Sequence, residues 1–471
     1  MTRDLTGAAA HELAAAIAGG TLRATDLMEA VLDRVAAANP ALNAVVSLRD
    51  RDALMAEARA AGREAPSGPL HGLPVAVKDL VATRGLRTTW GSPLFADHVP
   101  EADDLLAARL RGAGAILIGK TNVPEFGLGS HSFNPVFGVT RNPYDTARTA
   151  GGSSGGAAAA LAARMLPLAD GSDMMGSLRN PAGWCNVYSL RPTHGLVPPD
   201  PQGELFLHPL STDGPMARRP RDLALLLSVM AAPDPRVPNM RPAEDWPRGL
   251  DAEVKGRRIG WLGGWGGAWR TEPGILELCE EALGCFGALG ATVEPVAPPF
   301  SAAALWESWT TLRAFAVAAK LAAHYEDPVA RGRLKPEAVW EVEKGRRLSA
   351  AEVQAASLIR SDWYRRAAEL FGRYDALALP SAQLWPFPAE WRWPETIGGA
   401  KMDTYHRWME VVVPVSLIGL PCVTVPAGFG ANGLPMGLQL FGPRGADGRL
   451  LRIAQGYHGA TDWPNRRPPP L

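Results

Sequence analysis

Apolar and polar positions alternate along several short segments of the chain, as they do in β-strands. In the segment 70–80 (LHGLPVAVKDL), Leu73, Val75 and Val77 alternate with smaller or polar residues, which predicts a half-buried strand that ends near Lys78. The whole chain has only seven lysines, and arginine supplies nearly all the other positive charge. A lysine in an apolar strand is therefore a candidate for a specific role.

Helical spacing covers much of the remaining chain. The first 45 residues are predicted to be helical, and Asp26 followed by Glu29 predicts a capping box for a helix that runs to about Ala38. The small residues of 155–166 predict a helix suited to close packing, and 300–372 is predicted to be mostly helical. The further predicted elements are helices at about 103–112 and 275–289, and strands at 115–120, 257–263, 291–296, 374–380, 422–428 and 434–442.

The order of these elements predicts the fold class. Residues 257–296 read as a β–α–β unit, and Asn432-Gly433 between the last two strands is a typical hairpin turn. Helices interleave with strands from end to end, and neither a Pro/Ser-rich linker nor a repeat divides the chain. We therefore expect one large α/β/α layered domain over 1–471, with a mixed central sheet flanked by helices.

Two segments are predicted to be long loops. Residues 121–152 are rich in Gly, Asn, Pro and Ser, and ordered loops of this length are often functional. Residues 383–399 are rich in Trp and Pro and form either a loop pinned by aromatic packing or an aromatic rim over a binding cleft. The region of about 300–410 is expected to shape such a cleft.

Composition excludes several classes of function. A hydrophobic content of 46% indicates a globular core, and a formal net charge of zero argues against nucleic acid or an acidic membrane surface as a partner. Asp4, His11 and Glu12 interrupt the apolar N-terminus, which argues against a secretory signal, and no stretch of about 18 apolar residues predicts a membrane span. The four cysteines lack metal-ligand spacing, so we expect reduced thiols, no metal and a cytoplasmic protein.

The octet TAGGSSGG (149–156) allows three interpretations when taken alone. It could cradle a phosphate at a helix N-terminus, but it lacks the GK[ST] ending of a P-loop. Gly151, Ser153 and Gly155 match the GxSxG nucleophile elbow, but 141–150 does not read as the strand that this motif requires. The third interpretation is a flexible turn.

Further motifs place the octet in a wider pattern. Together they resemble the amidase signature family, and the resemblance covers almost the whole chain in the family's order and spacing. The motifs that carry it are GPLHGLPVAVKDL (68–80), GKTNVPEF (119–126), NPVFGVTRNPYD (134–145), AGGSSGG (150–156), GSDMMGSLRNPAGWC (171–185), LRPTHGLV (190–197) and the C-terminal LPCVTVPAG and GLPMGLQLFGP.

The resemblance implies a Ser–Ser–Lys catalytic triad and no cofactor. By motif match, Ser177 would be the nucleophile, Ser153 the bridging serine after a cis peptide, and Lys78 the base. The chemistry is sound in itself, because a serine hydroxyl needs a base and a buried lysine can be neutral near pH 7. The remaining implied roles are an oxyanion hole made by the backbone N–H groups of Met174, Met175, Gly176 and Ser177, an acyl-side pocket wall at Gly127, Leu128 and Gly129 after Phe126, and structural support from Ser172, Asp173 and Arg179.

The chain departs from the family pattern next to Ser177. The usual run is Thr-Asp-Thr-Gly-Gly-Ser, whereas this chain has Ser-Asp-Met-Met-Gly-Ser, with Met174 and Met175 before Gly176. A positive φ would strain methionine, so we expect an ordinary backbone conformation at position 175. The two thioether side chains could pack behind the loop or face the substrate as adaptable apolar contacts.

The predicted function is hydrolysis of a linear, apolar or aryl amide, with esters and carbamates as further candidate substrates. The expected partner is a small amide, and the expected state is a monomer or a homodimer without nucleic acid or membrane. The alternative within the fold is a glutamine-hydrolysing subunit of a tRNA-dependent amidotransferase, which would need partner chains. A non-catalytic binding relative is a third class, although such relatives typically lose triad members.

Overall fold

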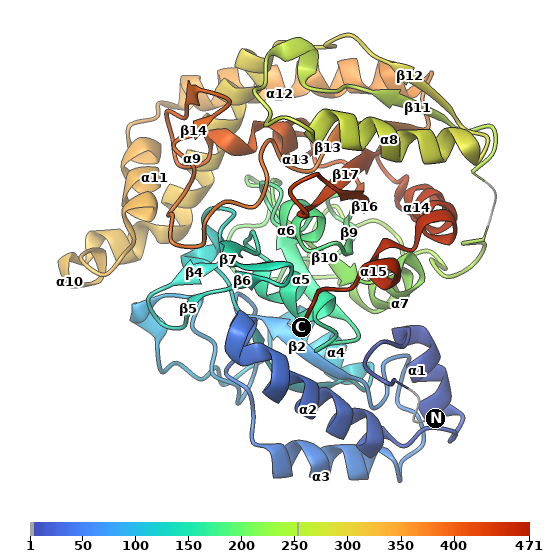
Figure 1. The fold of residues 1–471 in the computed structure, drawn as a ribbon. Helices are drawn as coiled ribbons and strands as arrows, with labels where there is room; N and C mark the ends of the chain where they lie inside the picture. Colours follow the sequence, from blue (N-terminus) through green and yellow to red (C-terminus); the bar gives the residue numbers. More distant parts are fainter. Residues whose placement is uncertain (1–3, 252–253) are drawn as a thin grey trace.

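The computed structural model describes residues 4–251 and 254–471, and its centre is one large mixed sheet (Figure 1). Within these residues eleven strands form the sheet. Their order is β1 (Val45–Val46), β3 (Ile116–Thr121), β2 (Pro74–Lys78), β8 (Ala169–Asp173), β10 (Thr212–Ala217), β9 (Tyr188–Arg191), β16 (Cys422–Phe429), β17 (Pro435–Phe441), β13 (Ala376–Pro380), β11 (Arg258–Trp261) and β12 (Thr292–Pro295).

The sheet has parallel pairs on both sides of an antiparallel middle, and its edge strand β1 pairs antiparallel with β3. β2 pairs in parallel with β3 and β8, and β11 pairs in parallel with β12 and β13. The strands from β8 to β13 pair antiparallel, so the C-terminal hairpin β16–β17 joins the two parallel ends through β9 and β10. This arrangement is the predicted layered α/β domain with a mixed sheet.

Helices cover both faces of the sheet, and α9, α10 and α11 form a projecting group on one side of it (Figure 1). The helices are α1 (Ala10–Ala18), α2 (Ala24–Leu42), α3 (Arg51–Ala61), α4 (Leu105–Gly112), α5 (Gly155–Ala162), α6 (Arg179–Trp184), α7 (Pro220–Met230), α8 (Ile275–Ala288), α9 (Ala302–Glu326), α10 (Pro328–Arg331), α11 (Pro336–Arg346), α12 (Ala350–Phe371), α13 (Val413–Leu417), α14 (Asp447–Thr461) and α15 (Trp463–Arg466). Short two-stranded pairs lie outside the main sheet: β4 (Phe133–Asn134) with β5 (Gly138–Val139), β6 (Arg141–Asn142) with β7 (Asp145–Thr149), and β14 (Thr396–Ile397) with β15 (Ala400–Lys401).

The small-residue helix α5 is buried along its whole length. A Cβ atom at Gly156 would lie 2.3 Å from the backbone nitrogen of Asn122, so a larger residue would collide with the main chain there. The predicted close packing is therefore confirmed, and it holds the turn before α5 against the sheet. The helix ends at Ala162, earlier than predicted.

Several local predictions are wrong in detail. β2 is buried on both faces rather than half-buried, because helices cover both sides of the sheet. The capping box at Asp26 and Glu29 does not form, because α2 starts at Ala24 after the N-cap Arg23, and Asp26 pairs with that arginine instead. The helix also continues to Leu42.

Other sequence features behave as predicted. Asn432-Gly433 lies in the turn of the β16–β17 hairpin, and Gly433 has a φ of +77°. The predicted loop 121–152 contains the β4–β5 and β6–β7 pairs between irregular stretches. The four cysteines are free thiols. None of the helices within the described ranges combines the length and hydropathy that crossing a membrane requires.

Phe387 anchors the Trp/Pro-rich segment 383–399 in the protein interior, while Trp391 of the same segment is 51% exposed. Phe387 is buried, and its ring contacts those of His131, Trp184 and Trp408. This geometry favours the packing interpretation of the segment over an aromatic rim.

Candidate active site

Four predicted site residues converge because their elements are neighbours in the sheet. Lys78 ends β2, Ser172 lies near the end of the adjacent β8, and Ser177 follows in the loop between β8 and α6. Ser153 lies in the turn before α5, which contacts both strands. Residues separated by up to 99 positions in the chain therefore share one site.

The Lys78 ammonium group is buried among serine hydroxyls. Its Nζ donates hydrogen bonds to Ser153 Oγ at 2.8 Å, Ser154 Oγ at 2.7 Å and Ser172 Oγ at 2.9 Å. The peptide bond between Gly152 and Ser153 is cis. Ser172, which the resemblance assigned to structural support, thus contacts the lysine directly.

Burial changes the acid–base behaviour of this lysine. It lowers the pKa of Lys78 to about 8, although the negative charges of Asp170, Asp213 and Asp173 oppose the shift. A lysine with this pKa holds a useful fraction of neutral amine near pH 7 to 8. The group can therefore accept a proton in that range.

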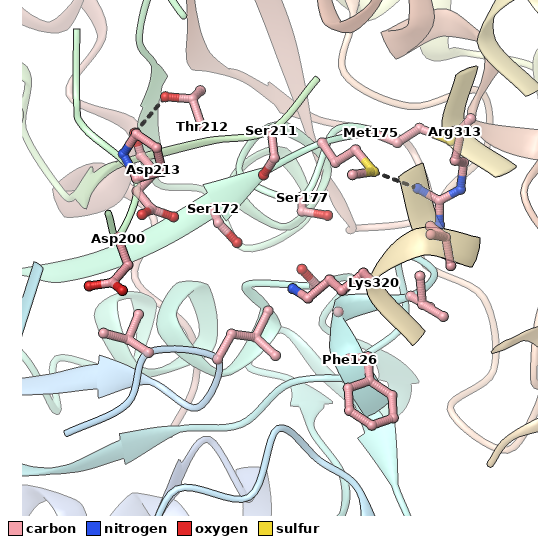
Figure 2. A pocket seen from close by; sticks show the side chains of 18 of the residues that line it. Phe126, Ser172, Met175, Ser177, Asp200, Ser211, Thr212, Asp213, Arg313 and Lys320 are labelled. Atoms are coloured by element: carbon pink, nitrogen blue, oxygen red, sulfur yellow. Dashed lines mark hydrogen bonds between the residues drawn. The ribbon is translucent and has the colours of Figure 1, made fainter. Parts of the chain in front are cut away.

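Ser177 lies on the wall of a cavity of about 340 Å³, together with Ser153 and Ser172 (Figure 2). The backbone N–H of Ser154 donates to the Ser177 carbonyl at 3.1 Å, which ties the two serine-bearing turns together. In the described part of the chain no hydrogen bond joins the Ser153 and Ser177 hydroxyls. Both groups nevertheless face the same space.

Three backbone N–H groups at and before Ser177 are unpaired in the part of the chain that the structure describes. Among the described residues, the N–H groups of Met174, Met175 and Ser177 have no hydrogen-bond partner. The Gly176 N–H differs, because it donates to Asp173 Oδ1 at 2.8 Å. Gly176 has a φ of +79°, whereas Met175 has an ordinary negative φ, as predicted.

The buried ion pair of Asp173 and Arg179 supports this loop. Both oxygens of Asp173 accept hydrogen bonds from Arg179 at 3.0 Å, and Arg191 lies 3.5 Å away. Although burial alone would raise the pKa of Asp173, the two guanidinium groups hold it well below its usual range. Asp173 is thus a fixed anion that accepts the N–H groups of Gly176 and Leu178.

Both methionine sulfurs accept hydrogen bonds from α9. Trp309 Nε1 donates to Met175 Sδ at 3.1 Å, and Arg313 Nη1 donates to Met174 Sδ at 3.2 Å. Met175 is only 3% exposed, whereas Met174 is half-buried, and both lie on the cavity wall. The two methionines therefore pack against α9 and also line the cavity.

The cavity has an apolar side and a charged end. Figure 2 shows Met175 and Arg313 on one side of Ser177, and Asp200 and Asp213 on the other. Gly127, Leu128 and Gly129 lie on its wall. The other lining side chains include the apolar Leu80, Phe126, Val317, Leu321 and Met409 and the charged Asp104 and Lys320, and none comes from 383–399.

Sequence reasoning missed three residues of this site. Ser154 lies inside the glycine- and serine-rich octet, where no motif match assigns it a role, although its hydroxyl accepts a hydrogen bond from Lys78. Asp213 lies opposite Ser172 in the β8–β10 ladder, and burial together with repulsion by Asp170 raises its pKa to about 7. Arg313 comes from a helix whose pattern carries no motif.

The His, Cys, Asp and Glu side chains of the described residues do not cluster as metal ligands do. Within residues 4–251 and 254–471 no three His, Cys, Asp or Glu side chains are grouped so as to hold a metal ion.

Comparison with known proteins gives consistent matches over the whole chain. The model of the family described as Amidase matches residues 26–451. An acylamidase from Rhodococcus erythropolis is 34% identical over 99% of this chain and 98% of its own length. A glutamyl-tRNA(Gln) amidotransferase subunit from Thermus thermophilus is 39% identical over 96% of this chain and 97% of its own. Among solved structures, a bacterial aryl acylamidase of the amidase signature family superposes with a TM-score of 0.90 at 28% identity, over 98% of this chain and 99% of that one.

Proposed function

This chain belongs to the amidase signature family and is a hydrolase of carbon–nitrogen amide bonds, and we propose that it cleaves linear apolar or aryl amides through an acyl-enzyme on Ser177. One observation carries the proposal: the Nζ atom of the buried Lys78 lies 2.8 Å from Ser153 Oγ, on the wall of the cavity that Ser177 faces. The lysine is the base, Ser153 relays the proton and Ser177 is the nucleophile.

The first step forms a bond between Ser177 Oγ and the amide carbon. Ser177 gives its proton to Ser153, and Ser153 gives its own proton to the neutral amine of Lys78. The π electrons of the carbonyl move to its oxygen, which becomes an oxyanion. The lowered pKa of Lys78 supports its role as acceptor near neutral pH.

The oxyanion is stabilised by backbone donors that are already in place. The free N–H groups of Met174, Met175 and Ser177 support this role, because preorganised donors stabilise charge that develops in the transition state. Gly176 does not belong to this set, because its N–H donates to Asp173 Oδ1.

The second step breaks the carbon–nitrogen bond and releases the amine. The oxyanion re-forms the carbonyl, and the leaving nitrogen takes back the proton from Lys78 through Ser153. Water then attacks the acyl-enzyme by the same proton path, the carboxylic acid leaves, and Ser177 regains its proton. Esters and carbamates carry carbonyl groups open to the same attack.

The apolar side of the cavity supports an apolar or aryl group on the substrate. Phe126, Leu128, Leu321 and the two methionine side chains offer such a surface next to Ser177. The acylamidase relative and the aryl acylamidase structure are consistent with this substrate class.

A second candidate is hydrolysis of glutamine within a multi-chain amidotransferase. The 39% identity to the Thermus thermophilus amidotransferase protein supports it, and so does the charged end of the cavity, where Asp200, Asp213 and Lys320 could meet an amino acid head group. This function would require partner chains.

Two measurements test the proposal. A fluorophosphonate probe followed by peptide mapping should label Ser177, and Ser177→Ala should abolish both labelling and turnover; labelling of another serine would overturn the assignment. Anilides, fatty amides, carbamates and glutamine should then be compared on the purified single chain. Glutamine turnover that appears only with added partner subunits would favour the second candidate.

A further inference from the structure

Arg313 is a cation set into the apolar side of the cavity. Helix α9 turns Arg313, Val317, Lys320 and Leu321 toward the cavity, so these residues form one face of the helix. Arg313 lies beside Met175, and Lys320 lies between Ser177 and Phe126 (Figure 2). The guanidinium group therefore flanks the loop that carries the proposed oxyanion donors.

Two side chains from other elements fix the guanidinium group. Arg313 Nε donates to Glu341 Oε1 at 2.7 Å, and its Nη2 donates to Tyr405 OH at 2.8 Å. Tyr405 OH donates in turn to Glu341 Oε1 at 2.7 Å, which closes a three-membered network. The side chains of Arg313 and Glu341 are 4% and 0% exposed, so the group is held rigidly and its charge is balanced.

The third nitrogen of Arg313 has only a weak partner. Nη1 carries two N–H groups, and among the described residues its hydrogen-bond acceptor is the Met174 sulfur at 3.2 Å. A thioether is a weak acceptor, whereas a buried charged donor is normally matched by oxygen. Donor capacity is thus left unused at the cavity wall.

We propose that Arg313 Nη1 is a substrate subsite for a neutral oxygen acceptor, such as an ether or carbonyl oxygen, on the part of the substrate that lies against the methionine side. The inference rests on the proposed function, in which the scissile carbonyl binds at Ser177. The oxygen takes the place of Met174 as acceptor, and the flexible thioether moves aside.

The charges around the cavity select a neutral oxygen over a carboxylate. Glu341 already neutralises Arg313, so the pair has no net charge to offer an anion. Asp104, Asp200 and Asp213 add three carboxyl groups to the lining against one Lys320. Asp200 and Asp213 lie on the other side of Ser177 from Arg313, so the lining adds no attraction for an anion at the Arg313 side.

The test is a series of p-nitroanilides of equal acyl length in which one methylene at a time is replaced by an ether oxygen. At one position the ether should raise kcat/KM by about 10- to 100-fold over the all-methylene compound in the wild-type protein. Arg313→Met combined with Glu341→Gln, which leaves no unpaired buried charge, should abolish this preference. The matched control is Arg346→Met, because Arg346 also joins α11 to α9 through an ion pair, with Glu326, but at the surface.

Fluorophosphonate labelling of Ser177 distinguishes failure of the subsite from failure of the proposed function. If labelling persists in the Arg313→Met, Glu341→Gln protein and the ether preference disappears, the subsite is supported. Labelling that persists together with an unchanged preference, or the absence of a preferred position in the wild type, would overturn the subsite alone. The subsite would also be overturned if a carboxylate-ended substrate were preferred over the ether and this preference depended on Arg313. Failure to label Ser177 in the wild type would overturn both the subsite and the proposed function.

Discussion

Arg179 Nη2 lies 3.0 Å from Asp173 Oδ1, and neither side chain is exposed to solvent. The pair sits directly beneath the loop that leads to Ser177, and Asp173 also holds the Gly176 and Leu178 N–H groups. One carboxylate therefore holds the backbone on both sides of Ser177.

Replacing this carboxylate should destabilise the protein strongly. Asp173→Asn removes the charge that balances Arg179 and Arg191, so we expect a loss of about 3–5 kcal/mol in the free energy of unfolding. Chemical denaturation measures this change. Asp362→Asn, which breaks an exposed pair with Arg365, is the control and should cost under about 1 kcal/mol; similar losses in both variants would refute the role of the buried pair.

The rate of Ser177 modification should rise with pH. The neutral form of Lys78, whose pKa is lowered to about 8, is the proton acceptor, and its fraction grows about 50-fold from pH 6 to pH 8. The fluorophosphonate labelling rate and kcat/KM should follow this curve and reach half of their maximum near pH 8. A flat profile over pH 6 to 9 would exclude Lys78 as the base.

Removing a nearby negative charge should move that midpoint to lower pH. Asp213 opposes the lowering of the Lys78 pKa, so Asp213→Asn should let it fall further and shift the labelling profile toward acid. Asp200→Asn is the matched control, because Asp200 lines the same cavity but is not among the groups that shift Lys78. Equal shifts in both variants would argue against a specific effect of Asp213.

The two methionines should respond differently to truncation. Met175 is almost fully buried and accepts from Trp309, so Met175→Ala should lower the free energy of unfolding by about 2–5 kcal/mol. Met174 is half-buried, so Met174→Ala should destabilise less and mainly raise KM for apolar amides. Thermal unfolding and anilide kinetics on both variants test this, and a larger stability loss for Met174→Ala would contradict it.

Gly176 should tolerate no side chain. Its φ is +79°, and a Cβ atom there would lie 2.0 Å from Asn180 Oδ1, so Gly176→Ala should distort the loop and abolish labelling of Ser177. Gly203 has a similar φ of +75° but no atom within 4 Å of such a Cβ. Gly203→Ala should therefore label normally, and loss of labelling in both variants would point to a general folding defect.

Seven strands of the main sheet were predicted from the sequence, namely β2, β3, β11, β12, β13, β16 and β17, whereas the neighbouring strands β8, β9 and β10 were not. β8 (ADGSD) has no β-branched or aromatic residue of the kind that marks strands, and β10 (TDGPMA) has only Thr212. Their glycines serve close packing instead: a Cβ atom at Gly171 would lie 2.5 Å from Leu178, and one at Gly214 would lie 2.2 Å from the Leu190 carbonyl. Tertiary packing thus overrides local preference in the middle of the sheet.

The candidate site also contains residues that the sequence predicted and residues that it did not. Motifs located Lys78, Ser153 and Ser177, because each lies in a short continuous stretch that resembles the family pattern. In the network with Glu341 and Tyr405, Arg313 lies 28 positions from Glu341 and 92 positions from Tyr405, so no local sequence pattern predicts it. Contacts of this kind exist only after the helices have packed.

The positions of the Arg179 partners in the sequence also determine when the loop can be completed during synthesis of the chain. Besides Asp173, this side chain donates to the Val412 carbonyl, Ser416 and Gln439, which lie 233 to 260 positions later in the chain. Synthesis runs from the N-terminus, so every serine and lysine of the proposed triad has left the ribosome long before those acceptors exist. The nascent chain therefore contains Lys78, Ser153 and Ser177 early. The proposed oxyanion loop is fully supported only after the β16–β17 hairpin, which contains Gln439, has been synthesised.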